Sequence, residues 1–159
     1  MTHKTRSFAS MGSVPRIMCV CLGNICRSPT AEAVLRQKSG ARLKVDSAGT
    51  GGWHIGDPPH GPMIKAAAAR GYDLHDLRGR KVTKQDFERF DLILAMDEQN
   101  KADLEALRPN NNDTPVTLMM SFAPDTGVSE VPDPYYTGDF DHALDLIEAA
   151  SKGLLQSLN

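Results

Sequence analysis

Apolar residues in this chain fall either in short continuous runs or at every third or fourth position. Continuous runs are typical of strands buried on both faces of a parallel sheet, and helical spacing is typical of helices with one buried face. The pattern predicts strands over 16–21, 43–45, 91–96 and 116–119. It predicts helices over 28–40, 63–70, 83–88, 97–107 and 140–158, with loops at 46–52, 57–61 and 122–138.

The alternation of strands and helices predicts the fold class. Strand–helix–strand units are right-handed and place their strands in parallel, so their helices cover both faces of one sheet. We therefore predict an α/β protein of three layers, with an open four-stranded parallel sheet in the middle. Such sheets bind ligands beyond the carboxyl ends of their strands, which makes the loop after strand 16–21 the first candidate site.

Length and charge narrow the functional classes. The 159 residues fit one domain, predicted over 15–159, after a flexible arm over 1–14. The formal net charge of −2 argues against a general binder of nucleic acid or of membrane surfaces. The longest apolar run, Ile17 to Leu22, is far shorter than the roughly 20 residues of a membrane span.

The three cysteines lie close together, at positions 19, 21 and 26. This clustered odd number does not fit a secreted disulfide framework and indicates a reduced protein of the cytoplasm. No CxxC pair or HxxxH spacing accompanies the thiols, so no metal or other cofactor is predicted. Cys19, inside the strand, is expected in the core.

The segment from Cys21 to Pro29 joins the first strand to the first helix. Backbone N–H groups at such a junction form a nest for an anion. Gly23 permits a positive φ, Asn24 tolerates one, and Arg27 adds a planar fork that matches two phosphate oxygens. The Walker pattern GxxxxGK[ST] is absent, which excludes a nucleotide loop of that type.

Cys21 stands at the start of this nest. A helix N-terminus and a neighbouring cation favour the thiolate, which is then placed for in-line attack on phosphorus. Ser28 is expected to cap the helix, with Pro29 at its first position, and to donate a hydrogen bond to the thiolate. The alternative, a strand-end cysteine without a chemical role, is disfavoured by the five-residue spacing to Arg27.

Asp133 lies between Pro132 and Pro134, which make its backbone stiff and extended. An Asp-Pro pair alone is typical of a turn. The two tyrosines that follow and the Cys21 loop favour instead a general acid, which protonates a tyrosinate leaving group and then activates water. The carboxyl must then be protonated in the working form, and a nearby phosphate charge favours this.

Other side chains are candidates for contact with the substrate or for support. Trp53 sits among glycines in a loop, and loops carry function. Tyr135 and Tyr136 can stack on a substrate ring, and at least one is expected to be partly exposed. Asp97 is expected to cap a helix, with orientation of Arg27 or of the 133 loop as a second role. Three histidines are expected on the surface or in loops, namely His54, His60 and His142.

Sequence blocks spread over nearly the whole chain after Val14 form a recognisable set. They are Val20-Cys-Leu-Gly-Asn-Ile-Cys-Arg-Ser-Pro29, Asp46-Ser-Ala-Gly-Thr50, Trp53, Val82-Thr-Lys-Gln-Asp-Phe87, Met96-Asp97 and Val131-Pro-Asp-Pro-Tyr-Tyr136. Together they resemble the low-molecular-weight protein tyrosine phosphatases. A bare CxxxxxR is shared by several phosphatase folds, but the ten-residue loop with the distant Asp-Pro-Tyr block is specific.

The resemblance implies a flavodoxin-like phosphotyrosine phosphatase I fold, no metal, and a cysteinyl-phosphate intermediate. It implies that Cys21 is the nucleophile, that Arg27 binds phosphate and that Asp133 is the general acid and base. The substrate-binding residues that it implies are Leu22, Gly23, Asn24, Ile25, Cys26, Ser28, Trp53, Tyr135 and Tyr136. The expected substrates are phosphotyrosine-containing proteins or small aryl phosphates, the product is inorganic phosphate, and the protein is expected to be a monomer or weak dimer.

One position departs from the family pattern. Many members carry a histidine before Val-Thr-Lys that braces the loop asparagine, and Leu77 stands there in this chain, while Arg80 matches a basic position. His75, two residues away, is a candidate substitute. The departure raises the question of what braces Asn24.

Two other functional classes are considered. Some arsenate reductases resemble this fold and loop, but they need a relay pair of further cysteines, and no cysteine follows Cys26. A non-catalytic phosphate-binding module would be expected to lose the thiol or the acid, and both are present. Cys21 and Cys26 also bracket one tight loop, so a reversible disulfide is predicted after oxidation, unless Cys26 only packs beneath the loop.

Overall fold

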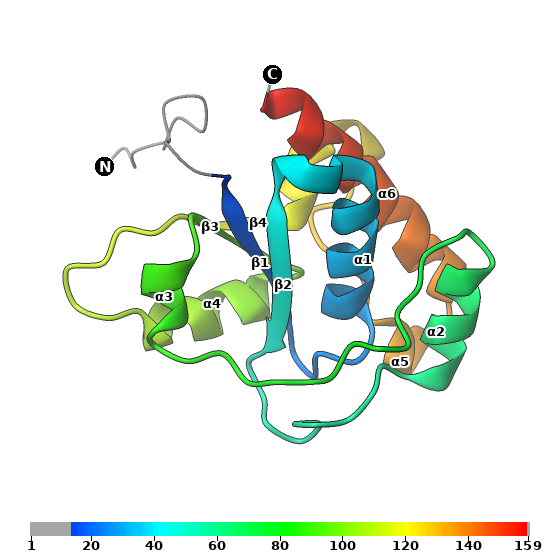
Figure 1. Ribbon diagram of the computed structural model, residues 1–159, viewed down its shortest axis with the longest axis horizontal. Coiled ribbons are helices and arrows are strands. Elements are labelled where there is room, and N and C mark those ends of the chain that lie inside the picture. The colour runs from blue at the N-terminus through cyan, green and yellow to red at the C-terminus, as the bar shows by residue number, and fades with distance from the viewer. Residues whose placement is uncertain (1–13, 159) are drawn as a thin grey trace.

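The computed structural model describes residues 14–158, so the predicted arm over 1–14 lies outside the described residues except for its last position. A four-stranded sheet forms the centre of the molecule, and all neighbouring strands in it are parallel. In spatial order the strands are β2 (Lys44–Gly49), β1 (Arg16–Cys21), β3 (Leu92–Ala95) and β4 (Val116–Leu118) (Figure 1). The predicted α/β class and parallel sheet are confirmed.

Strand β1 occupies the centre of this sheet. Ile17 pairs with Val45 of β2 on one side and with Leu92 of β3 on the other. The chain leaves β1 and forms β2 on one side of it. It then crosses over to form β3 on the opposite side of β1. The carboxyl ends of β1 and β3 therefore form a switch point, the place at which such sheets bind ligands.

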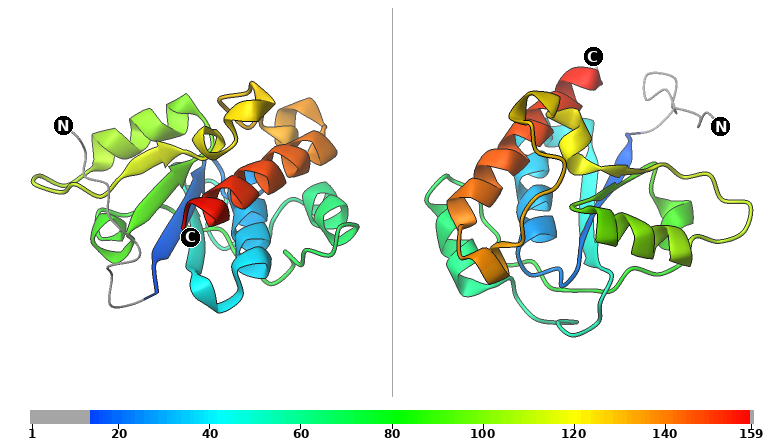
Figure 2. Two further views of the ribbon diagram at one scale, coloured as in Figure 1. Left: turned by 90° about the horizontal axis from the view of Figure 1, so that it is seen from above. Right: turned by 180° about the vertical axis from the view of Figure 1, so that it is seen from behind.

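Helices cover both faces of the sheet, as the views in Figure 2 show. One layer contains α1 (Arg27–Ser39) and α6 (Phe140–Ser157), which pack against each other, and α2 (Gly61–Ala68), which packs against α6. The other layer contains α3 (Asp86–Arg89) and α4 (Glu98–Leu107). The short elements are α5 (Pro134–Thr137), η2 (Gly40–Arg42), η3 (Met119–Phe122) and η4 (Pro124–Thr126).

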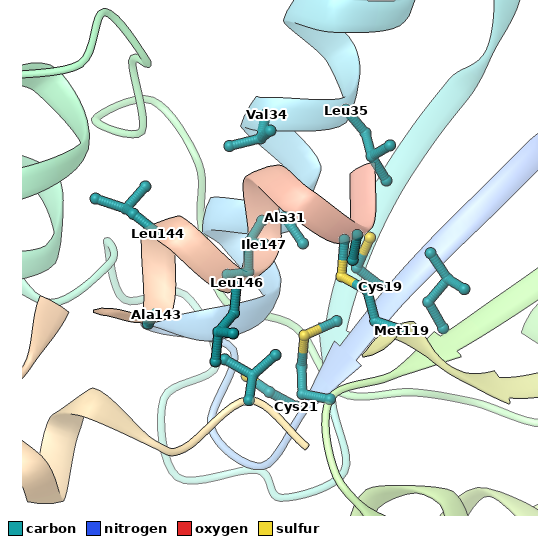
Figure 3. Packing of buried hydrophobic residues seen from close by; sticks show 14 of the residues in the cluster. Cys19, Cys21, Ala31, Val34, Leu35, Met119, Ala143, Leu144, Leu146 and Ile147 are labelled. Atoms are coloured by element: carbon teal, nitrogen blue, oxygen red, sulfur yellow. The ribbon is translucent and has the colours of Figure 1, made fainter. Parts of the chain in front are cut away.

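Alternation along β1 divides the hydrophobic core into two clusters. Its odd-numbered residues 17, 19 and 21 face α1 and α6, and Met18 and Val20 face α3 and α4. Figure 3 shows Cys19 and Cys21 beneath side chains of α1 and α6. Cys19 is fully buried, and burial raises the pKa of its thiol well above the usual value, so the predicted core role is confirmed. Within residues 14–158, no helix combines the length and apolarity needed to cross a membrane.

Two boundaries near the first loop differ from the prediction. β2 continues to Gly49 through a segment predicted as loop, because residues 46–49 pair with residues 18–21 of β1. The helix α1 begins at Arg27 with Cys26 at its N-cap position, so the predicted Ser28 cap is wrong. The Ser28 hydroxyl lies against Cys21 instead.

Other boundaries differ for local reasons. The helix predicted over 83–88 is α3, and Thr83 does not cap it, because Thr83 donates to the buried Asp86 carboxylate through its N–H and its hydroxyl. The predicted loop 122–138 contains η4 and α5, since a proline in the first turn after Asp133 favours a helical turn. Likewise Pro62 allows α2 to begin inside the predicted loop 57–61. β4 ends at Leu118, one residue before the predicted end, because η3 begins at Met119.

Candidate active site

The segment 21–27, here called the cysteine loop, runs from the carboxyl end of β1 into the N-terminus of α1. Its course depends on Asn24, whose φ of 58° lies in the left-handed region, as predicted. The Asn24 N–H donates to Cys21 Sγ at 3.2 Å. Among residues 14–158, no partner is found for three backbone N–H groups that an oxyanion could therefore use, those of Gly23, Ile25 and Cys26.

Glycines give the cysteine loop the space it needs. At the end of β2, an added Cβ on Gly49 would lie 2.8 Å from the Leu22 carbonyl oxygen. Gly23 does not use the positive φ that glycine permits. Gly23 matters for its small size, since an added Cβ would lie 3.2 Å from the His54 ring.

Asn24 is the centre of a buried hydrogen-bond network that ends at Cys21. Its amide donates to Ser28 Oγ at 2.8 Å and to Ser47 Oγ at 3.0 Å. Ser28 Oγ lies 3.0 Å from Cys21 Sγ and 3.4 Å from the Ala48 carbonyl oxygen. Because Ser28 accepts from Asn24, its single hydroxyl proton is available to the nearer sulfur, and Ser28 can donate to a thiolate.

The network continues to a buried carboxylate on α1. Ser47 donates to Glu32 at 2.6 Å, and Arg36 pairs with the other oxygen of Glu32 at 2.6 Å. Burial raises the pKa of Glu32, against the opposing effects of the Ser47 hydrogen bond and the Arg36 charge. Sequence reasoning missed Ser47 and Glu32. The available signal was the spacing of Ser28, Glu32 and Arg36 at every fourth position, which places them on one side of a helix.

A different set of contacts replaces the family's histidine in bracing Asn24. Besides the two serines, the Arg80 backbone N–H donates to Asn24 Oδ1 at 3.0 Å. Leu77, at the histidine position, packs against the core. His75 is exposed and contacts Asp73, so the expectation that it substitutes for the histidine is wrong.

Arg27 is only 3% exposed, and the partners of its guanidinium contact Nη1 and Nη2. Its Nη1 donates to Asp97 at 2.7 Å and to the Val131 carbonyl at 2.9 Å, and its Nη2 donates to Asp133 Oδ2 at 3.3 Å. In the described part of the chain, Nε is buried without a partner. The Nε–Nη2 edge is therefore the edge that can bind two oxygens of a phosphate.

Negative groups keep Arg27 positively charged. Burial would lower its pKa, but the charges of Cys21, Asp97 and Asp133 and the hydrogen bond to Asp97 outweigh burial and raise that pKa. Asp97 also accepts the Asn100 N–H at 2.8 Å as the N-cap of α4. Both predicted roles of Asp97, the helix cap and the orientation of Arg27, are confirmed.

Asp133 reaches the cysteine loop from a segment far along the chain. Its backbone is extended, with φ −80° and ψ 109°, as predicted from the flanking prolines. Its Oδ1 accepts the Tyr135 N–H at 3.1 Å and so caps α5, while Oδ2 contacts Arg27. One carboxylate oxygen is thus anchored, and the other faces the guanidinium.

A cavity of about 240 Å³ lies over the cysteine loop. Trp53 and Tyr136 at its rim are 72% and 75% exposed, and Tyr135 is 48% exposed, as expected for the tyrosines. The Trp53 ring rests on Gly51, where an added Cβ would lie 2.0 Å from Cζ3. Of the predicted site residues, Asn24, Arg27 and Ser28 are buried outside the lining. The lining residues are Cys21, Leu22, Gly23, Ile25, Cys26, Trp53, His54, Asp133, Tyr135 and Tyr136.

Two histidines expected to be ordinary surface or loop residues belong to this region. His54 lines the cavity, and its Nδ1 lies 3.1 Å from Asp57. His60 packs against Tyr135, with ring centroids 5.1 Å apart. The sequence carried no signal for these contacts, because they depend on how the segment between β2 and α2 packs against the cysteine loop and Tyr135.

Cys26 differs chemically from Cys21. Burial, followed by the charges of Asp133 and Cys21, raises the pKa of Cys26 to about 12 despite the nearby Arg27. Cys26 therefore stays a thiol at neutral pH. Among the described residues, the side chains close enough to share a metal ion are the exposed Asp73, His75 and Asp76, and none of them lines the cavity.

Comparisons with known proteins agree over almost the whole chain. The family of low molecular weight phosphotyrosine protein phosphatases matches residues 16–159. The low molecular weight protein-tyrosine-phosphatase YfkJ of Bacillus subtilis is 40% identical over 147 residues, which cover 89% of this chain and 94% of that protein. The crystal structure of YfkJ is similar with a TM-score of 0.88 at 38% identity, covering 94% of this chain and 97% of that one. DARP, a Drosophila arginine phosphatase, has a TM-score of 0.83 at 31% identity, over 89% of this chain and 96% of its own.

Proposed function

This chain belongs to the low molecular weight phosphotyrosine protein phosphatases, and on that premise we propose that Cys21, Arg27 and Asp133 carry out its reaction. The family consists of protein-tyrosine-phosphatases, which are hydrolases. The observation that carries the assignment is that a thiol at the end of β1 and the Asp133 carboxyl line one cavity, and that a buried guanidinium of the cysteine loop contacts this carboxyl.

In the first step, Cys21 Sγ attacks the phosphorus of phosphotyrosine in line with the bond to the tyrosine oxygen. The P–S bond forms as the P–O bond breaks, and Asp133 donates a proton to the departing oxygen. The transferred group carries its charge on three oxygens, which face the N–H groups of the cysteine loop and the free edge of Arg27.

The surroundings of Cys21 support its use as a thiolate. The Asn24 N–H and the Ser28 hydroxyl are both within hydrogen-bond reach of the sulfur. The N-terminus of α1 and the positive charge of Arg27 add to the stabilisation of negative charge at this point.

Arg27 links substrate binding to the state of Asp133. Its Nη1 is occupied by Asp97 and Val131, so a phosphate must bind at Nε and Nη2. Nη2 is the atom that holds Asp133 without substrate. A bound phosphate therefore competes with Asp133 for Arg27. The negative charge of this phosphate favours the protonated form of the released carboxyl, which is the form that donates a proton.

In the second step, Asp133 accepts a proton from water, and that water attacks the phosphocysteine. The P–S bond breaks, inorganic phosphate forms, and the electron pair returns to Cys21 as a thiolate. The general acid of the first step is thus restored as a proton donor. No metal or cofactor is used.

The rim supports an aromatic substrate. Trp53, Tyr135 and Tyr136 line the cavity and can contact a tyrosine ring on its sides. The proposed substrates are therefore phosphotyrosine in proteins and small aryl phosphates. The reductase alternative still lacks its relay cysteines after Cys26, and a merely binding module would not need a thiol, an arginine and a carboxyl together.

The proposal also covers the domain organisation, oligomeric state and cellular compartment of the protein. Residues 15–159 would act as one domain, as monomer or weak dimer. Free cysteines at 19, 21 and 26 support a reducing compartment such as the cytoplasm.

The deciding experiment measures hydrolysis of a phosphotyrosine peptide and of p-nitrophenyl phosphate with a metal chelator present. Phosphoarginine serves as a third substrate, since the similar Drosophila protein is an arginine phosphatase. We expect full activity on both aryl phosphates with chelator and little on phosphoarginine. Acid quenching during turnover should trap phosphate on Cys21, as seen by mass spectrometry.

Cys21→Ser is the matched control. A serine hydroxyl is not ionised near neutral pH, so activity should fall below about 1% while phosphate still binds. Preferential hydrolysis of phosphoarginine would overturn the substrate assignment. Substantial turnover by Cys21→Ser, or phosphate trapped on another residue, would overturn the mechanism.

A further inference from the structure

His60 contacts both the cysteine loop and the segment that carries Asp133. Its backbone N–H donates to the Ile25 carbonyl in the cysteine loop at 2.8 Å. Its imidazole packs against the Tyr135 ring, with centroids 5.1 Å apart and planes at 62°. Tyr135 follows Asp133 by two residues in the wall of the cavity. One residue therefore spans the distance between the phosphate-binding loop and the segment that carries the acid.

His60 is itself held by elements outside the cavity. It stands at the N-cap position of α2, where its carbonyl accepts the Met63 and Ile64 N–H groups at 2.9 and 3.0 Å. Its ring also packs against Phe140 at the start of α6, at 5.8 Å between centroids. α5 lies beside the N-terminal end of α2, where the contact between His60 and Tyr135 is made (Figure 1). Two helices thus fix the ring, and the ring can serve as a support for Tyr135.

A second connection between the cysteine loop and the Asp133 segment runs through Arg27. That residue donates to Val131 and Asp133, and the proposed mechanism gives its Nη2 to the phosphate. The contact with Asp133 is then weakened when the substrate is bound. The contact between His60 and Tyr135 uses no group that binds phosphate, so it persists.

We propose that His60 is a positioning residue for phosphotyrosine hydrolysis. Its ring holds Tyr135, and with it the Asp133 segment, at a set distance from the cysteine loop while substrate occupies Arg27. His60 touches no reacting atom. The inference rests on the proposed function and adds to it a residue that determines the fit of the substrate's aromatic ring.

The test compares His60→Ala and His60→Phe with the parent protein, and His142→Ala is the matched control because His142 is exposed on α6. All variants keep the backbone N–H that holds Ile25. An aromatic contact is worth enough for a change of about 2–10-fold in binding. We expect His60→Ala to raise KM for a phosphotyrosine peptide by about this factor, while the inhibition constant of inorganic phosphate changes by less than about twofold.

Loss of the support should also move Asp133. In His60→Ala, kcat for the phosphotyrosine peptide should therefore fall more than kcat for p-nitrophenyl phosphate, whose leaving group needs less protonation. His60→Phe should restore both values, because it replaces one ring by another, and His142→Ala should match the parent.

Three outcomes would overturn the proposal. They are parental kinetics in His60→Ala, equal damage in His60→Phe and His60→Ala, and equal weakening of phosphate inhibition and peptide binding, which would indicate general damage to the loop. Thermal unfolding of each variant shows whether the protein is folded. A parent protein without activity on the peptide would instead contradict the proposed function, so the two failures can be told apart.

Discussion

The cysteine loop lies below the cavity and is here called its floor; within it, Arg27 and Asn24 are each 3% exposed, and both make hydrogen bonds to several partners. At the rim, Trp53 and Tyr136 are 72% and 75% exposed and are placed by contacts between apolar surfaces and rings. The floor residues lie between the carboxyl end of β1 and the first turn of α1, whereas the rim residues lie in the turn after β2 and in α5. Under the proposed function, we expect the floor to fix the position of the phosphate and the rim to select the group that is attached to it.

The sharpest test of this division changes the floor alone. Arg27→Lys keeps the charge but cannot present the two N–H donors of a planar edge. Each such donor is worth about 10²–10³ in rate, so we expect kcat/KM to fall by about 10⁴-fold or more for every substrate alike. Steady-state kinetics on peptide and aryl phosphate measure this. A loss confined to the peptide would place Arg27 with the rim.

Asp133→Ala acts between floor and rim. We expect phosphotyrosine hydrolysis to slow by about 10²–10⁴-fold, because a tyrosinate needs a proton to leave. Substrates with a good leaving group, such as p-nitrophenyl phosphate, should lose much less. A plot of kcat against leaving-group pKa measures the difference. An equal loss for all leaving groups would remove Asp133 from the role of general acid.

Ser47→Ala tests the support beneath the floor. It removes the bond from Asn24 and leaves the buried Glu32 without its serine donor, so the free energy of unfolding should fall by about 1–3 kcal/mol. The matched control is Ser151→Ala, because the buried Ser151 hydroxyl has no partner within residues 14–158. Urea unfolding measures both. Equal losses would show that the network does not stabilise the fold.

A rim substitution should affect binding with little effect on chemistry. Trp53→Ala is expected to raise KM for a phosphotyrosine peptide about tenfold, from the loss of one aromatic contact, with kcat within about twofold of the parent. Ile55→Ala is the control, since Ile55 is 61% exposed but does not line the cavity. A fall in kcat with unchanged KM would contradict the division between floor and rim.

Among these substitutions, the one at Cys26 is expected to change the activity before oxidation the least. Cys26→Ala should keep most of its activity, since this side chain is an uncharged thiol with a pKa of about 12. After peroxide, the parent should recover with reductant through a Cys21–Cys26 disulfide, and the variant should recover less. Recovery of the parent should improve as pH rises, because more Cys26 is then thiolate. Full recovery of the variant would exclude Cys26 as the resolving thiol.

The sequence predicted those features that depend on one segment at a time. β1 was predicted from its apolar run, and Asp97 as a helix cap from its place between strand and helix. Several features that depend on a distant partner were missed, although the contact between Asp97 and Arg27 was predicted. Residues 46–49 are small or polar, and they form a strand because β1 pairs with them.

The same limit applied to the site. Cys21, Arg27 and Asp133 were singled out as candidates because their local patterns are unusual, whereas Ser47 and His60 lie in ordinary sequence surroundings. Ser28 was given the role of a cap because serine before proline suits a helix start, but a buried sulfur nearby uses its hydroxyl. The position of a hydroxyl can be read from sequence more easily than the partner that it finds.

The chain contains a single tryptophan, and that residue forms part of the rim. Its indole is mostly exposed to water and rests on Gly51, so its emission arises from one known place. An aromatic ligand that enters the cavity replaces water around this indole, which changes the intensity and the colour of the emitted light. The protein therefore carries a built-in optical reporter, with which occupancy of the cavity can be followed in real time without a dye.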